Sequence, residues 1–291
     1  MAIVETERSP RTKHFSGASG NRIVGDLWGP EDGPLVVLLH GGGQTRHSWR
    51  RAGAALAAEG VRALALDARG HGDSAWIADG DYRGASMVED VVRVLREVPG
   101  RPVIVGASMG GMTGLMVADR IGAEGARGLV LVDIVPGFAS AGGERVVAFM
   151  NSRPDGFASL EEAADAVSAY LPHQERPKSA DGLRRNLRQR ENGRWYWHWD
   201  PAFLTPHEGD IQAYEAHMAD MDRAARELPV PLAVIRGALS DVVSAEALDR
   251  FRGIAPQAEV VELSDAGHTA AGSDNYSFTQ AVVALATRMP E

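Results

Sequence analysis

Residues 102–111 read Pro-Val-Ile-Val-Gly-Ala-Ser-Met-Gly-Gly and contain the pattern Gly-x-Ser-x-Gly, centred on Ser108. The apolar residues before the serine predict a buried strand, and the residues after it fit the start of a helix. A serine between a strand and a helix lies on a sharp turn that exposes its hydroxyl. Gly106 and Gly110 leave room where that turn brings the backbone together. The segment predicts a nucleophilic serine, although 33 glycines also allow an incidental match.

Short apolar runs alternate with helical stretches on both sides of this segment, which predicts an α/β fold with a mainly parallel sheet and helices on both faces. The expected strands are 35–39, 61–66, 103–105, 129–132, 232–235 and 259–263. The expected helices are 49–58, 88–98, 112–121 and 245–251, and residues 14–27 are expected to form a leading hairpin.

The alternation stops after Val132 and resumes at Pro231. The stretch between them shows helical patterns, such as 160–170 and 183–190, without a strong strand signal. We therefore expect an all-helical cap domain at 137–225, inserted after strand 6 of a core domain formed by 1–136 and 226–291.

Alternate residues of this expected cap are aromatic, namely Trp195, Trp197 and Trp199. In an extended conformation the three indole rings lie on one face. Trp197 and Trp199 are candidates to line an apolar substrate pocket. The alternative is that the rings only pack the cap against itself or against the core.

A second glycine-rich stretch, Leu-Leu-His-Gly-Gly-Gly-Gln at 38–44, directly follows an expected strand. Its backbone amides can approach an anion closely. We expect the amides of Gly42 and Met109 to donate hydrogen bonds to the oxyanion that forms when the serine attacks a carbonyl group. A phosphate-binding loop is the competing interpretation, but no Gly-Lys-Ser/Thr follows and no Gly-x-Gly-x-x-Gly occurs. His40 is expected to be a structural hydrogen-bonding group rather than a base.

A nucleophilic serine needs a base, and the base needs an orienting carboxylate. His268 is the candidate base, since it is the one histidine beyond the insertion and comes just after the last expected strand. Asp241, in the loop after the preceding strand, is the candidate acid. Asp133, at the end of the strand 129–132, is its rival, whereas Asp265 is too close to His268 in sequence to orient it.

With these motifs in the chain order serine, aspartate, histidine, the sequence resembles capped, esterase-like serine hydrolases of the α/β-hydrolase fold. The resemblance covers about residues 20–135 and 226–289. The stretch Asp-Ala-Arg-Gly-His-Gly-Asp-Ser at 67–74 is similar to a loop that braces the site in this superfamily, so Asp67, Arg69 and His71 are expected to be scaffold.

Serine at the turn, where the haloalkane dehalogenases and epoxide hydrolases of this fold carry aspartate, implies acyl transfer. The resemblance thus implies a serine hydrolase of small, apolar carboxylic esters that needs no metal or organic cofactor. Two alternatives on the same fold are a carbon–carbon bond hydrolase of ring-fission diketones and a cofactor-free perhydrolase. The diketone hydrolases commonly carry Pro-Gly after the glycine run and Trp after the catalytic histidine. This chain has Gln44-Thr45 and Thr269-Ala270 at those places, which argues against that activity. A third alternative is a non-catalytic small-molecule receptor.

Composition excludes several other classes. The absence of cysteine rules out disulfides, thiolate metal sites and a cysteine nucleophile. A net charge of −9 argues against a nucleic-acid partner. The longest charge-free run, 102–118, is interrupted by four glycines, which argues against a membrane-spanning helix. Residues 1–13 lack the apolar stretch of a secretory signal peptide. We therefore expect a cytoplasmic monomer or homodimer with a small-molecule ester as its partner and no membrane association.

Overall fold

The computed structural model describes residues 9–137, 140–170, 176, 179–205, 210–264 and 276–290, and it does not describe the side chains of 140–141 and 210–215. An eight-stranded sheet with the strand order β1-β2-β4-β3-β5-β6-β9-β10 forms its centre. The strands are β1 Arg11–Ser16, β2 Arg22–Trp28, β3 Leu35–Leu39, β4 Arg62–Leu66, β5 Val103–Ala107, β6 Gly128–Val132, β9 Leu232–Gly237 and β10 Glu259–Leu263. Strand β2 is antiparallel to both β1 and β4, and the remaining neighbours are parallel. The mainly parallel α/β sheet is confirmed.

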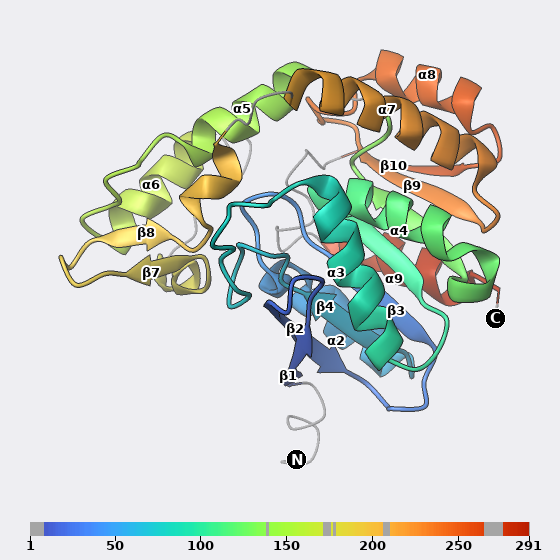
Figure 1. Cartoon of the computed structure of the whole chain (residues 1–291), viewed down its shortest axis with the longest axis horizontal. Helices are drawn as coiled ribbons and strands as arrows, with labels where there is room; N and C mark the ends of the chain where they lie inside the picture. Colours follow the sequence, from blue (N-terminus) through green and yellow to red (C-terminus); the bar gives the residue numbers. More distant parts are fainter. Residues whose placement is uncertain are drawn as a thin grey trace.

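Helices cover both faces of the sheet (Figure 1). One face packs against α3 (Gly84–Glu97), α4 (Met109–Gly125), α7 (Asp210–Glu227) and α8 (Ala245–Ile254). The other face packs against α2 (Arg50–Ala58) and α9 (Tyr276–Arg288). Because side chains alternate along a strand, β3 sends Val37 and Leu39 into the first core and Val36 and Leu38 into the second.

The segment between β6 and β9 is not all-helical, so that prediction is wrong. It contains α5 (Ser140–Met150), α6 (Leu160–Tyr170), the 3₁₀ turns η2 (Asp181–Arg185) and η3 (Pro201–Leu204), and two short strands. The strands β7 (Leu187–Gln189) and β8 (Trp195–Trp197) pair antiparallel with each other. The helix expected at 183–190 is therefore a 3₁₀ turn followed by a strand.

The inserted segment has a small hydrophobic core of its own, formed around Phe157, Leu160 and Leu187. Figure 1 shows α5, α6, β7 and β8 gathered at one side of the sheet domain. The end of α7 belongs to the main core instead, since Met221 and Ala224 are buried there. Within the described ranges, no helix is both long and apolar enough to cross a membrane.

Candidate active site

Ser108 occupies the sharp turn between β5 and α4. Its φ of 48° is in the left-handed region, and its N–H donates to Val132 O at 3.2 Å. The turn requires glycine on both sides, because a Cβ on Gly106 would lie 2.2 Å from the carbonyl oxygen of Gly110. A Cβ on Gly110 would lie 2.3 Å from the carbonyl oxygen of Leu39. The strained backbone at Ser108 thus fits the turn expected from the sequence.

The glycine run after β3 lies next to this turn. A Cβ built on Gly41 would be 3.4 Å from the Cβ of Ser108, whereas one built on Gly42 would have no heavy atom within 4 Å. Gly42 therefore faces open space close to the serine. Met109 begins α4, and the first turn of a helix offers free amides and a positive dipole end to an anion. The structure brings both expected oxyanion donors to the surroundings of Ser108.

Two buried histidines bind the backbone on either side of Gly42. His40 Nδ1 donates to Gly41 O at 2.8 Å, and its Nε2 accepts from Ala68 N–H at 3.0 Å. His71 Nε2 accepts from Gly43 N–H at 3.3 Å. Burial lowers the pKa of His40 to about 4, and burial and the nearby His40 lower that of His71 to about 3. Both rings are neutral near pH 7, which these hydrogen bonds require.

A third buried histidine, His198, comes from the inserted segment. Its Nδ1 accepts from Gly72 N–H at 2.7 Å, and its ring lies 5.8 Å from that of His71. Burial lowers the pKa of His198 well below its ordinary value. The inserted segment is thereby tied to the loop 67–74, which in turn contacts the glycine run.

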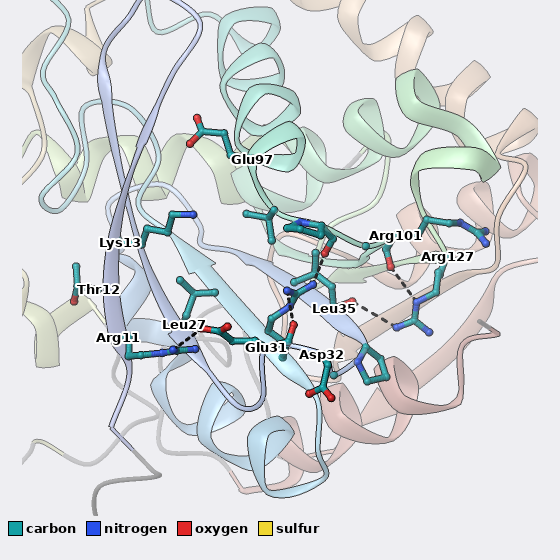
Figure 2. Close-up of a pocket in the computed structure, with 16 residues that line it drawn as sticks. Arg11, Thr12, Lys13, Leu27, Glu31, Asp32, Leu35, Glu97, Arg101 and Arg127 are labelled. Carbon is teal, nitrogen blue, oxygen red and sulfur yellow. Dashed lines mark hydrogen bonds and ion pairs between the residues drawn. The ribbon is translucent and has the colours of Figure 1, made fainter.

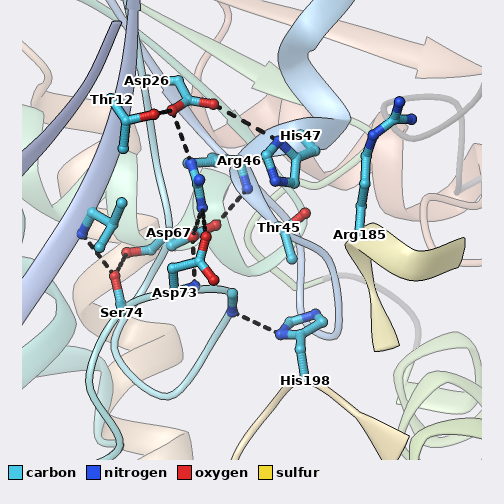
Figure 3. Close-up of polar contacts among 12 residues, drawn as sticks. Thr12, Asp26, Thr45, Arg46, His47, Asp67, Asp73, Ser74, Arg185 and His198 are labelled. Atoms are coloured by element: carbon cyan, nitrogen blue, oxygen red, sulfur yellow. Dashed lines mark hydrogen bonds and ion pairs between the residues drawn. The ribbon is translucent and has the colours of Figure 1, made fainter. Parts of the chain in front are cut away.

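The loop 67–74 is the scaffold that the sequence indicates (Figure 3). The Asp67 carboxylate accepts from the backbone N–H groups of Arg46 and Asp73, and it forms an ion pair with the Arg46 side chain. Arg69 makes two hydrogen bonds to Asp90, at 2.6 and 2.8 Å. These side chains are buried and paired, so they brace the loop.

The two candidate acids lie in different surroundings. Asp133 is 1% exposed, and its carboxylate accepts from Gly237 N–H at 3.0 Å and from Ser240 Oγ at 2.6 Å. The Asp241 side chain is 36% exposed, and its Oδ2 lies 2.6 Å from Nη2 of Arg145 in α5. The candidate base His268 lies outside the described residues.

The aromatic residues of the inserted segment form a continuous set of ring contacts. Trp197 and Trp199 stack with centroids 5.0 Å apart, and Phe149 lies 5.7 Å from Trp197 and stacks on Tyr170. A Cβ built on Gly43 would lie 3.3 Å from the Trp199 ring. Trp199 thus reaches the glycine run, while Trp197 also packs on the small core of the inserted segment.

A groove of about 990 Å³ lies at the other end of the sheet (Figure 2). It is lined by Leu35 and Arg62, the first residues of β3 and β4, and by Arg101 just before β5. Ser108 follows the opposite end of β5, and parallel strands share their ends, so this groove is not the catalytic pocket. In the part of the chain that the structure describes, no three histidine or acidic side chains are grouped to hold a metal ion.

The model of the α/β-hydrolase fold family matches residues 34–273. The chain belongs to this family. It is 35% identical to the esterase Rv0045c of Mycobacterium tuberculosis over 75% of this chain and 70% of that protein. It is 27% identical to a 3-hydroxybutyrate-oligomer hydrolase of Cupriavidus necator, over 87% and 89% of the two chains. A solved structure of the mycobacterial esterase superposes with a TM-score of 0.73 at 29% identity, covering 98% of this chain and 96% of that one.

The chain is therefore an esterase-like α/β hydrolase, and it belongs to the class of carboxylic ester hydrolases. Sequence reasoning missed two contacts of the inserted segment, one from His198 to the loop 67–74 and one from Arg145 to the candidate acid Asp241. The Gly-His-Gly at 70–72 hinted at a loop near the site, but no local pattern shows which residue of the insertion meets it.

Proposed function

We propose that the chain cleaves carboxylic esters of small, apolar substrates through an acyl-enzyme on Ser108. The observation that carries the proposal is the left-handed backbone of Ser108 at the start of α4, with the Gly41–Gly42 backbone beside it. This arrangement presents a hydroxyl and free backbone amides to the same small space. An ester carbonyl placed there meets its nucleophile and its oxyanion donors together.

The proposed reaction has two halves. His268 takes the Ser108 proton as the oxygen attacks the ester carbonyl, and the Gly42 and Met109 amides stabilise the oxyanion. The imidazolium then protonates the leaving alcohol, which leaves the acyl group on Ser108. A water molecule gives a proton to His268 and attacks the acyl-enzyme, which releases the carboxylic acid and restores the serine.

Asp241 is the proposed carboxylate that orients His268. Its place in the loop after β9 supports this role, because loops at this end of neighbouring parallel strands meet above the serine. Asp133, at the end of β6, is the alternative. Either residue would hold the imidazole in the required tautomer and stabilise the imidazolium form.

The inserted segment, residues 137–225, acts in this proposal as a cap that selects the substrate. Trp199 lies against Gly43, and the ring contacts continue through Trp197 to Phe149. An apolar wall of this kind next to the oxyanion donors favours uncharged acyl or alcohol groups. The substrate is thus expected to be a small organic ester.

The proposal is tested with short p-nitrophenyl esters. The wild-type chain is expected to release p-nitrophenol, and Ser108→Ala should lose at least about 10³-fold in kcat, since the nucleophile is essential. Ser152→Ala, a surface serine in the inserted segment, is the matched control and should keep full activity. Equal rates for the wild type and Ser108→Ala would refute the proposal.

A further inference from the structure

The backbone N–H groups of the glycine run after β3 differ in their hydrogen bonding. The Gly41 N–H donates to Gln44 Oε1 at 3.1 Å, and the Gln44 N–H donates back to Gly41 O at 3.1 Å. The Gly43 N–H donates to His71 Nε2 at 3.3 Å. Among the residues that the structure describes, the Gly42 N–H has no hydrogen-bond partner. The amide left unpaired in this run is thus the one that the sequence predicts as an oxyanion donor.

The direction of the Gly42 N–H is set by the peptide bond that it shares with the Gly41 carbonyl. A peptide bond is planar, and in the trans form its C=O and N–H point in opposite directions. The Gly41 oxygen accepts from His40 Nδ1 at 2.8 Å as well as from the Gln44 N–H. Two donors hold this oxygen on one side, so the Gly42 N–H points to the other.

The Gln44 side chain holds the peptide bond on the other side of Gly41. Its carboxamide oxygen accepts from the Gly41 N–H, so that Gln44 bonds both backbone groups of Gly41. A Cβ built on Gly41 would lie 3.2 Å from Gln44 Oε1 and 3.4 Å from the Cβ of Ser108. The carboxamide and the nucleophile therefore pack against the same side of Gly41.

The glycine run needs such bonds, because glycine leaves the backbone wide conformational freedom. Gly43 uses this freedom, with a φ of 73°. Gly41 is buried, and a buried N–H without a partner costs free energy. Without the Gln44 oxygen, the turn would move until the Gly41 N–H met another acceptor. This movement would rotate the adjoining peptide bond and turn the Gly42 N–H away from the oxyanion.

We propose that Gln44 is a positioning residue that aims the Gly42 N–H at the oxyanion. The inference rests on the proposed function, because it concerns an amide that acts there as an oxyanion donor. Gln44 acts through the backbone of Gly41 and needs no contact with the substrate. Its effect belongs to the transition state, in which the carbonyl oxygen carries negative charge, and not to the binding of the neutral ester.

Gln44→Met removes the acceptor at nearly constant side-chain volume. Complete loss of an oxyanion donor costs about 10²- to 10³-fold in kcat, so a misdirected donor should cost about 10- to 100-fold. KM for p-nitrophenyl butyrate should change less than about 3-fold, because the ground-state carbonyl is neutral. Gln44→Ala lacks the acceptor too, but it also removes most of the side chain. Equal losses in the two variants would assign the effect to the hydrogen bond rather than to packing.

Gln257→Met is the matched control. The Gln257 carboxamide also bonds the backbone, with Nε2 donating to Ala225 O at 3.0 Å. Gln257 comes just before β10, at the opposite end of the parallel strands from Ser108. This variant loses the same kind of bond, so its melting temperature measures what that loss costs in stability. Its kcat should equal that of the wild type.

An alkyl trifluoromethyl ketone gives a readout that a weakened fold does not produce. The Ser108 oxygen adds to the ketone carbon, the ketone oxygen becomes the oxyanion, and the serine proton passes to the general base. Each variant is assayed at a temperature where its circular dichroism spectrum matches that of the wild type. Gln44→Met should bind the ketone about 10- to 100-fold more weakly, in proportion to its loss of kcat, and Gln257→Met as tightly as the wild type.

Two outcomes would overturn the inference. Full kcat in Gln44→Met would show that the side-chain hydrogen bond positions nothing. A loss of kcat without a matching loss of ketone affinity would place the effect outside the oxyanion site. In both cases Ser108→Ala would still be inactive, so the proposed serine mechanism would stand. Failure of the proposed function gives a different result, namely wild-type and Ser108→Ala rates that are equal.

Discussion

Arg145 of helix α5 and Asp241 of the loop after β9 form an ion pair, with Nη2 and Oδ2 2.6 Å apart. The inserted segment therefore contacts the proposed acid directly. Gly142 lies at the same contact, where a Cβ would be 2.6 Å from the carbonyl oxygen of Asp241. The position of α5 and the electrostatics of the proposed triad are thereby coupled.

Replacing Arg145 should shift the pH profile of ester hydrolysis and leave the free energy of unfolding nearly unchanged. Both side chains are partly exposed, at 53% and 36%, and such pairs contribute at most about 1 kcal/mol. Without the guanidinium, Asp241 stabilises the imidazolium of His268 more strongly. The acidic limb of kcat/KM should then move to higher pH, by up to about 1 unit in Arg145→Gln. Arg145→Lys keeps the charge and should show a smaller shift; movement to lower pH would contradict the assignment of Asp241.

The glycines at the serine turn should not tolerate a methyl group. Gly110→Ala places a Cβ against the Leu39 carbonyl oxygen, so the turn or β3 must move, at a cost of about 1–3 kcal/mol and with loss of esterase activity. Gly253→Ala in helix α8 is the matched control, since a Cβ there meets nothing within 4 Å. The control should gain up to about 1 kcal/mol, as alanine favours a helix. Thermal melts and ester turnover check both variants, and an active Gly110→Ala would argue against the described turn.

The buried histidines should make the fold sensitive to acid. The pKa of His40 is about 4 in the folded chain, against 6.5 when unfolded, so the unfolded chain binds more protons between these values. The neutral, buried His40 contributes fully to the free energy of unfolding above pH 6.5. This contribution, on the order of 3 kcal/mol for His40 alone, is lost as the pH falls to about 4. Denaturant titrations from pH 8 to pH 4 measure this slope.

His71→Gln isolates one of these groups. Glutamine offers an acceptor oxygen near the position of Nε2, so the bond from Gly43 N–H can be kept while the titration is removed. The free energy of unfolding should then fall less steeply below pH 6.5 than in the wild type. An unchanged slope would mean that carboxylates account for the acid sensitivity.

Because Trp199 contacts the glycine run, its side chain should affect the hydrolysis of bulky substrates more than that of small ones. Trp199→Leu removes ring surface beside Gly43, so kcat/KM should change more for hexanoate than for acetate esters. Trp195→Leu is the control, because Trp195 packs on Arg184 within the inserted segment. Equal effects of the two substitutions on all chain lengths would confine Trp199 to a packing role.

Much of the sheet could be predicted because each strand is a local apolar run. The strands expected at 35–39 and 259–263 have the observed bounds of β3 and β10, and the others begin or end within two residues of the observed ones. The short strands β7 and β8 could not be predicted, because three residues are too few to show the alternation of apolar and polar side chains that indicates a strand. Each of the two strands is formed only through its pairing with the other. The arginines in and around them favour a helix by composition.

The places of the candidate nucleophile Ser108 and of the expected oxyanion donors Gly42 and Met109 could be predicted for a similar reason, since each lies in a short motif beside a strand. The long-range contacts around them could not, because Asp133 and Ser240 are 107 residues apart and Gly72 and His198 are 126 apart. Contacts of this length depend on how the insertion and the loops pack. The assignment of His268 and the choice between Asp241 and Asp133 stay predictions.

An acyl-enzyme on Ser108 is the centre of the proposed mechanism, and peptide mass spectrometry of the quenched protein tests it most directly. The wild-type chain would be mixed with a p-nitrophenyl ester, quenched in acid within the first turnovers and digested to locate the adduct. We predict a mass increase of one acyl group on the peptide that contains Ser108, and none in Ser108→Ala. An acyl group on another residue, or turnover without an adduct at Ser108, would contradict the mechanism.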